Sequence, residues 1–377
     1  MKKLLFGIAD ACLAGFTFAQ DAPLWMRHSV ISPDGTTIAF TYKGDIYTVP
    51  VAGGRAMQIT TNPAYDTAPV WSPDSKRIAF ASDRMGSLDV YIVAKDGGEP
   101  RRLTTHSGSE TPLAFTDAGH VLFSAGIMPS AEAVVFPSNG QFNQVYRVSV
   151  EGGRPTMISS MPMECISINK EGAMLYQDKK GYEDYWRKHH VSPIARDIWM
   201  YTPGKEPQYR QLTTFGGEDR EPVWAPDGKT FYYLSEENGS FNIYRRTPGD
   251  AKAVQLTHYT KNPVRYLSAA TDGRLCYGFD GEIYTLLPGG EAQKVNISIV
   301  SDRNDKDIIR QIKSSGATEM AVSPDGKEVA FVLRGDVYVT SVEYKTTKQI
   351  TNTPCQERTV DFAPDGRTLV YASERGG

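Results

Sequence analysis

A turn of the Ser-Pro-Asp-Gly type recurs eight times along this 377-residue sequence and constrains its fold more than any other feature. Successive turns are separated by intervals of 40 to 56 residues. The acidic residues at these turns are Asp34, Asp74, Asp117, Glu171, Asp227, Asp272, Asp325 and Asp365. A repeat of roughly 40–50 residues built from short strands is typical of a β-propeller, in which small sheets pack radially around a channel.

The repeat at Ala68–Thr104 shows the internal order most clearly. Four short runs rich in Val, Ile, Phe, Tyr and Trp are separated by turn residues, as in four antiparallel strands. Pro73 fixes φ at the second position of a type I turn, and Asp74 suits the third position. Gly86 and the Gly97-Gly98 pair supply the two following turns. One such repeat is too small to be stable alone, so the sequence predicts an all-β chain of packed repeats.

The rhythm of the repeats breaks after the sixth one. The run 301–307 is the most highly charged in the chain, which suits a linker. We therefore expect three regions after the N-terminal segment. They are a six-bladed β-propeller over 20–297, a linker over 298–318, and the first, incomplete blades of a second β-propeller over 319–377.

The last repeat is incomplete. It has two expected strands, Thr359–Ala363 and Leu369–Ala372, and the sequence stops at Gly377, where the repeat at Ala68–Thr104 continues into a third strand. Half a blade would leave unpaired strand edges. We therefore expect the chain to be a truncated part of a longer protein.

The N-terminal residues 1–19 have the features of a secretory signal peptide. Lys2 and Lys3 precede an apolar stretch, and Ala19 provides a small residue before the expected cleavage site. Asp10 is unusual within such a stretch, and a first β-strand is the alternative interpretation. No later apolar run approaches the ~18 residues that span a bilayer, so we expect no membrane span. The expected location is the periplasm or another exported compartment.

The charge balance argues against one class of partner. Lys and Arg number 41 and Asp and Glu number 44, for a formal net charge of −3 without a basic cluster. Nucleic-acid binding requires a concentrated cationic surface, so we expect no nucleic-acid partner.

The cysteines that remain after removal of residues 1–19 are Cys165, Cys276 and Cys355. They lie in three different repeats, and none belongs to a Cys-x-x-Cys pair. This distribution favours free thiols over a disulfide framework or a metal site.

Two insertions interrupt the repeats between the expected second and third strands. Met128–Phe142 extends the third repeat, and Gly181–Trp199 extends the fourth. Such loops can be solvated connections, but propellers also place binding surfaces on the loops of one rim. In the second insertion Arg187 and Lys188 are expected to face solvent or a channel, as are His189 and His190. Adjacent histidines lack the i, i+4 spacing of two metal ligands on a helix, so we expect no metal there.

No catalytic motif is recognisable in the sequence. It has no Gly-x-Ser-x-Gly and no His-Glu-x-x-His. Gly228-Lys229-Thr230 resembles the end of a phosphate loop, but Val223 stands where the first glycine belongs. We therefore assign no catalytic, cofactor-binding or metal-binding residue and expect no cofactor. A Ser-His-Asp triad assembled from distant residues stays open, because triads are recognised by geometry.

Two stretches carry a family resemblance beyond the TolB-like repeat itself. Trp186–His190 followed by Arg196–Trp199, and the later run Gln211–Val223, strongly resemble the N-terminal region of tricorn-like proteases. The resemblance implies a six-bladed propeller, a seven-bladed one, a PDZ-like domain and a serine peptidase core. No family catalytic residue maps onto this chain. Pro193 and Ile194 depart from the pattern and affect the expected loop shape.

The resemblance implies a function for the intact protein. It is expected to be an exported serine peptidase whose propellers admit substrate peptides and release products, with its catalytic residues outside this chain. Whether this chain belongs to an enzyme stays uncertain from its own residues, and self-association stays open. The alternative is a non-catalytic propeller that serves as a binding scaffold at the cell envelope or is attached to another hydrolase domain. The gene sequence beyond Gly377 distinguishes the two.

Overall fold

The computed structural model describes residues 23–126, 142–181, 191–300 and 314–376. Within these residues every regular element is a β-strand, apart from one 3-10 turn, η2, at Glu374–Gly376. The strands form consecutive antiparallel meanders. The predicted all-β class is confirmed.

Six four-stranded sheets follow one another in the first part of the described chain. The first sheet contains β1 (Arg27–Ile31), β2 (Thr37–Tyr42), β3 (Asp45–Pro50) and β5 (Met57–Gln58). The second contains β6 (Asp66–Trp71), β7 (Arg77–Ser82), β8 (Asp89–Ala94) and β9 (Arg101–Arg102). The third contains β10 (Glu110–Asp117), β11 (His120–Ala125), β12 (Gln144–Ser149) and β13 (Thr156–Ser159).

The next three sheets repeat this plan. The fourth contains β14 (Met163–Ile168), β15 (Met174–Asp178), β16 (Ile198–Thr202) and β17 (Gln208–Gln211). The fifth contains β18 (Asp219–Trp224), β19 (Phe231–Ser235), β20 (Asn242–Arg246) and β21 (Val254–Gln255). The sixth contains β22 (Arg265–Ala269), β23 (Leu275–Phe279), β24 (Glu282–Leu286) and β25 (Gln293–Lys294).

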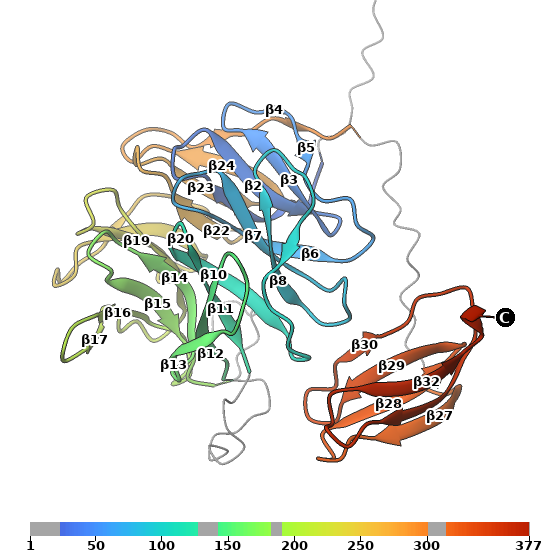
Figure 1. Cartoon of the computed structure of the whole chain (residues 1–377). Helices are drawn as coiled ribbons and strands as arrows, with labels where there is room; N and C mark the ends of the chain where they lie inside the picture. Colours follow the sequence, from blue (N-terminus) through green and yellow to red (C-terminus); the bar gives the residue numbers. More distant parts are fainter. Residues whose placement is uncertain (1–22, 127–141, 182–190, 301–313, 377) are drawn as a thin grey trace, which may run out of the picture.

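The first strands of these six sheets contact one another in a cycle. β1 touches β6, the contacts continue through β10, β14 and β18 to β22, and β22 touches β1 again. Figure 1 shows the sheets grouped around this centre. Radial sheets with their first strands innermost are the architecture of a β-propeller, as the repeats predict.

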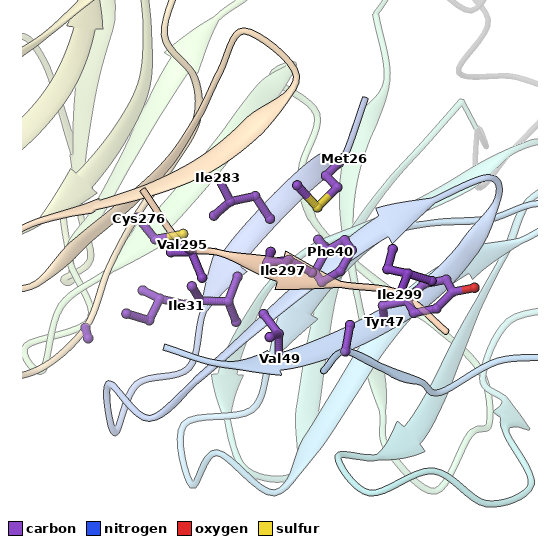
Figure 2. Packing of buried hydrophobic residues seen from close by; sticks show 13 residues of the cluster. Met26, Ile31, Phe40, Tyr47, Val49, Cys276, Ile283, Val295, Ile297 and Ile299 are labelled. Atoms are coloured by element: carbon purple, nitrogen blue, oxygen red, sulfur yellow. The ribbon is translucent and has the colours of Figure 1, made fainter. Parts of the chain in front are cut away.

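The hydrophobic core is divided among the interfaces between neighbouring sheets. Each of six buried clusters joins two adjacent sheets, and together they complete the same cycle as the first strands. The cluster between the first and sixth sheets includes Phe40, Val49, Cys276 and Ile283 (Figure 2). A repeat therefore buries its apolar faces only when both neighbours are present, which is why single repeats are not stable.

A short parallel pair closes the cycle. β26 (Ile297–Ser298) pairs with β4 (Gly54–Arg55), which lies beside the first sheet. The chain must pass closely here, because a Cβ on Gly53 would lie 2.6 Å from the Asn296 carbonyl oxygen. Ile299 also packs into the cluster between the first and sixth sheets. The ring of sheets therefore extends at least two residues beyond residue 297, where we expected the first propeller to end.

The recurring turn owes its shape to side-chain hydrogen bonds. At the second repeat the Ser72 hydroxyl donates to the Asp74 carboxylate over 2.5 Å. Ser75, the next residue of this turn, adopts the left-handed backbone conformation with φ of 58°. This hydrogen bond lowers the pKa of Asp74. The same bond occurs between Ser32 and Asp34 and between Ser323 and Asp325. The Asp in the motif is therefore the acceptor that fixes the turn.

Two further sheets follow the sixth one, in red in Figure 1. One contains β27 (Ala317–Val322), β28 (Glu328–Leu333), β29 (Asp336–Ser341) and β30 (Thr347–Gln349), and the other pairs β31 (Glu357–Phe362) with β32 (Leu369–Ser373). The charged run 301–307 lies outside the described residues. The division into a six-bladed propeller, a linker and the start of a second propeller stays a prediction.

The hairpin of β29 and β30 contacts the ring next to the second sheet. Lys348 Nζ donates to the His106 carbonyl over 2.9 Å and lies 3.5 Å from Asp89 Oδ1. The rings of His106 and Tyr344 meet edge to face at 5.8 Å. Beside this contact Glu110, which is 1% exposed, has its pKa raised to about 8 by burial. Burial also raises the pKa of Asp89 and lowers that of Lys348.

Candidate functional site

The two predicted insertions leave the ring at the same rim. The first connects β11 to β12 and the second connects β15 to β16, so each lies where a second strand ends and the first strands begin. We call this end of the sheets the insertion rim. Most of the first insertion (127–141) and the core of the second (182–190), with Arg187, Lys188, His189 and His190, lie outside the described residues.

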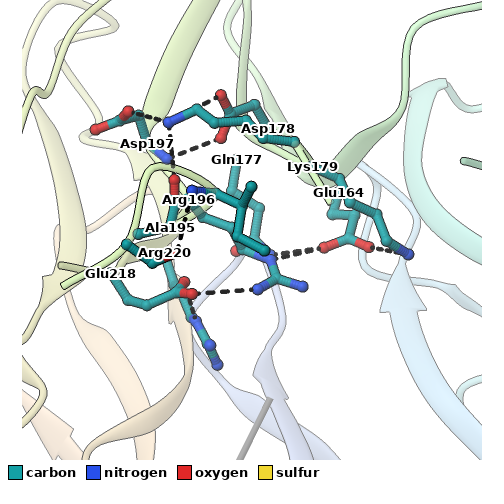
Figure 3. A network of polar contacts seen from close by, with 12 residues as sticks. Glu164, Gln177, Asp178, Lys179, Ala195, Arg196, Asp197, Glu218 and Arg220 are labelled. Carbon is teal, nitrogen blue, oxygen red and sulfur yellow. Dashed lines mark hydrogen bonds and ion pairs between the residues drawn. The ribbon is translucent and has the colours of Figure 1, made fainter. Parts of the chain in front are cut away.

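The described ends of the second insertion are tied together by Lys180. Its Nζ donates to the Ala195 carbonyl over 2.8 Å and pairs with Asp197 Oδ2 at 2.5 Å (Figure 3). Asp178 holds the other side of the same junction, because its carboxylate accepts hydrogen bonds from the Asp197 backbone and the Trp199 indole. These contacts hold the two described ends of the second insertion together.

Arg196 links the same junction to the next sheet. It pairs with Glu164 at 3.3 Å and with Glu218 at 3.4 Å, and Glu218 in turn pairs with Arg220 at 2.8 Å. Arg196, Glu218 and Arg220 are all buried. Burial alone would raise the pKa of Glu164, but the charges of Arg196 and Lys179 outweigh burial and lower it. The alternating charges fix the insertion rim across the fourth and fifth sheets.

The first strands carry a recurring irregularity that the sequence does not reveal. In five of the six first strands of the described ring, the pairing register shifts at a residue in the left-handed backbone region. These residues are His28 (φ 49°), Ala68 (51°), Cys165 (52°), Glu221 (50°) and Tyr266 (57°). None is a glycine, so each position costs on the order of 1–3 kcal/mol of strain. Bulges of this kind redirect side chains.

Glu221 shows what the bulge achieves. Its backbone N–H donates to the Gln177 side chain over 3.0 Å, and its carboxylate accepts from the Leu267 backbone over 2.8 Å. One residue therefore bridges to a sheet on each side. Cys165 is exposed to solvent, yet burial raises the pKa of its thiol well above its usual range, followed by the charges of Glu221 and Glu164. Cys165 belongs to β14, one of the first strands that contact one another in the cycle.

Among the described residues, no three His, Cys, Asp or Glu side chains are grouped to hold a metal ion. Cys165, Cys276 and Cys355 are free thiols. No helix in the described part is long and apolar enough to cross a membrane. The structure brings Glu164, Arg196 and Glu218 together at the insertion rim. The family resemblance had singled out the segments that contain Arg196 and Glu218, but not Glu164.

Comparison with known protein families shows which family this chain belongs to. Residues 23–292 match the model of the tricorn protease N-terminal beta propeller domain. The chain belongs to this family. Among curated relatives, this chain is 26% identical over 289 residues to tricorn protease homolog 1 of Streptomyces coelicolor, and the match covers 75% of this chain and 26% of the relative. It is 25% identical over 333 residues to the tricorn protease of Thermoplasma acidophilum, covering 85% of this chain and 29% of that protein.

A solved structure agrees with the fold. The crystal structure of the tricorn protease superimposes with a TM-score of 0.60 and 18% identity, over 90% of this chain and 32% of the solved chain. The predicted resemblance to tricorn-like proteases is confirmed. The tricorn propeller spans only about a quarter to a third of the length of these relatives.

Proposed function

We propose that this chain is the propeller region through which an exported, tricorn-like serine peptidase admits peptides and releases products. One observation supports the proposal: in this tricorn-family propeller an innermost strand carries an exposed residue, Cys165, next to the rim that bears both insertions. A narrow passage of this kind accepts an extended peptide and excludes a folded domain.

The supports of the rim favour a passage over a passive scaffold. The buried ion pairs of Arg196 lie at the insertion rim, and the strained bulges lie in the first strands, so both are close to the proposed passage. Strain at defined positions persists where the surroundings impose it, often at functional sites. The proposed role in peptide passage accounts for this location.

Hydrolysis is the first test. Confinement of a peptide lowers no reaction barrier without a nucleophile, a base and an oxyanion site, and these are proposed to lie in a core outside this chain. Residues 20–377 and the intact protein should be assayed on a mixed peptide library at equal molar amounts. We expect turnover only by the intact protein, with sensitivity to serine-directed inhibitors. An intact protein without peptidase activity would favour the scaffold.

Peptide passage is tested by attaching a bulky group to Cys165, which should narrow the proposed passage. In the intact protein with Cys355→Ser, a bulky maleimide at Cys165 should slow hydrolysis of long peptides at least fivefold and leave a short chromogenic peptide within twofold. The matched control is the Cys165→Ser, Cys355→Ser protein exposed to the same reagent. Equal slowing of both substrates, or of neither, would contradict passage past Cys165.

Export is part of the same proposal. Residues 1–19 are proposed to direct the protein to the periplasm or another exported compartment. Cell fractionation combined with N-terminal sequencing of the mature protein tests this. We expect a new N-terminus at Gln20, and an intact Met1 in the cytoplasmic fraction would refute export.

A further inference from the structure

A hollow on the insertion rim lies over the first sheet. It has a volume of about 700 Å³, and its walls include Leu24, Trp25, Arg27, Tyr42, Lys43 and Tyr65. Arg27 begins β1, and Tyr65 directly precedes β6, so the hollow lies between the starts of two neighbouring innermost strands. Whatever passes along the centre of the ring at this rim therefore passes the hollow.

Trp25 is the most unusual residue in these walls. Its backbone is left-handed, with φ of 68°, and 71% of the residue is exposed. The sixth sheet holds it there: the Met26 N–H donates to the Gly281 carbonyl over 3.1 Å, and a Cβ on Gly281 would lie 3.0 Å from the Trp25 nitrogen. The fold thus imposes an unfavourable backbone and leaves the indole uncovered. Leu24 is likewise half exposed, and contiguous apolar exposure of this kind marks a binding surface.

The charge of the hollow selects the kind of ligand. Lys43 is exposed at its edge, on the turn between β2 and β3, and Gly44 follows it in that turn. The φ values of 47° and 79° at these two residues fix a tight turn that presents the ammonium group. Arg27 is a second basic residue in the walls, and the described lining residues include no Asp or Glu, although the Asp83 carboxylate accepts a hydrogen bond from the Tyr65 backbone over 2.7 Å. The exposed ammonium group of Lys43 favours a carboxylate over a cation at this edge of the hollow.

We propose that this hollow binds an extended peptide in which an aromatic residue neighbours an acidic residue. The aromatic side chain packs against Trp25 and Tyr65, and the acidic side chain lies beside Lys43. The aromatic ring of the peptide can stack offset on Trp25 or Tyr65 or meet either ring edge to face. The Lys43 ammonium group adds selectivity for the carboxylate of the neighbouring acidic residue. This inference rests on the proposed passage of peptides along the rim.

The probe is a dye-labelled, C-terminally amidated hexapeptide, Gly-Ser-Phe-Glu-Ser-Gly, titrated with this chain and followed by fluorescence polarisation. We expect saturable binding at low ionic strength. Replacing Phe by Ala in the peptide should weaken binding at least tenfold, and replacing Glu by Gln roughly fivefold. Binding should also weaken as salt is raised, because the charges are exposed.

Variants locate the binding. Trp25→Gly removes the indole and suits the left-handed backbone, so the fold is retained while affinity falls at least tenfold. Lys43→Glu should reverse the preference, so that a peptide with Lys in place of Glu binds more tightly than the original. The matched control is Arg334→Glu, which changes the same position of the corresponding turn between β28 and β29 and should leave affinity within twofold.

The outcomes separate this inference from the proposed function. Unchanged affinity in Trp25→Gly, no reversal in Lys43→Glu, or no binding up to 1 mM peptide would overturn the inference while leaving peptide hydrolysis by the intact protein untouched. Binding that requires a free peptide C-terminus in place of the acidic side chain would also overturn it. If the intact protein hydrolysed no peptide, the proposed function would be contradicted. The peptide titration would still show whether the hollow binds the hexapeptide.

Discussion

Glu110 offers the sharpest test of the electrostatics next to the ring. The residue begins β10, is 1% exposed, and lies near Asp89 and Lys348. Burial raises its pKa from the ordinary 4.5 to about 8, and the charge of Asp89 adds to the effect. The folded protein therefore keeps this carboxyl group protonated at neutral pH. Glu110→Gln replaces the protonated acid with a neutral group of nearly the same shape that cannot ionise.

The sign and size follow from the two pKa values. Below pH 4.5 the carboxyl group is protonated in both the folded and the unfolded state, so its ionisation costs no stability. Between pH 4.5 and 8 the unfolded chain loses the proton and the folded one keeps it, which costs about 1.4 kcal/mol of unfolding free energy per pH unit. The whole interval sets an upper limit of about 5 kcal/mol. The pKa of about 8 already includes the opposing charge of Lys348. Because the effective dielectric constant around buried groups in proteins is about 20, which reduces such shifts, we expect about 2 kcal/mol.

The assay is urea unfolding followed by circular dichroism at pH 5 and at pH 8.5. The unfolding free energy of Glu110→Gln relative to the parent should rise by about 2 kcal/mol between these values. Exposed Glu343 provides the control, and Glu343→Gln should show no such rise. If the stability difference between Glu110→Gln and the parent is the same at both pH values, Glu110 does not titrate with a raised pKa.

Three further predictions concern the ring. Ile297→Ala should lower the unfolding free energy measured by urea titration by about 2–4 kcal/mol, because its side chain is buried at the closing strand pair. In the control, Val300→Ala should change the unfolding free energy by less than about 0.5 kcal/mol, because Val300 is exposed. Lys180→Met should lower the unfolding free energy by about 1–3 kcal/mol, because Asp197 loses its closest partner. Lys205 is exposed, so an equal loss of unfolding free energy in Lys205→Met would contradict this explanation. Thiol titration of the denatured, unreduced protein lacking residues 1–19 should count three thiols, with Cys276 the slowest to react in the native protein; a count of one would reveal a disulfide.

The parts of the fold that sequence could predict are local. Each recurring turn is specified within four residues, since the hydroxyl of Ser72 and the carboxylate of Asp74 meet inside the same turn. The alternation of short β-rich runs with these turns then fixes a four-stranded repeat. The two insertions were also visible in sequence, because they lengthen a regular spacing.

The remaining features depend on distant contacts. The bulged residues include His28, Cys165 and Glu221, which share no chemical property that a pattern could detect, because the neighbouring sheets impose their backbone. The closing pair β4–β26 involves two residues on each side and has no periodicity. Lys348 lies 259 residues from Asp89 in the chain, so that ion pair becomes visible only after both sheets are placed.

The way in which the ring is closed has an evolutionary consequence. Every four-stranded sheet of the described ring is a single uninterrupted segment of the gene product. The seam between the first and last sheets relies on side-chain packing, one short strand pair and single hydrogen bonds such as that from Met26 to Gly281. Duplication or loss of a DNA segment that encodes one repeat would therefore change the number of sheets without splitting any of them between the chain ends. Selection would then act mainly on the seam, where Phe40, Ile283 and Ile297 must fit new neighbours. A family built in this way can vary its ring size by recombination and refine the seam afterwards.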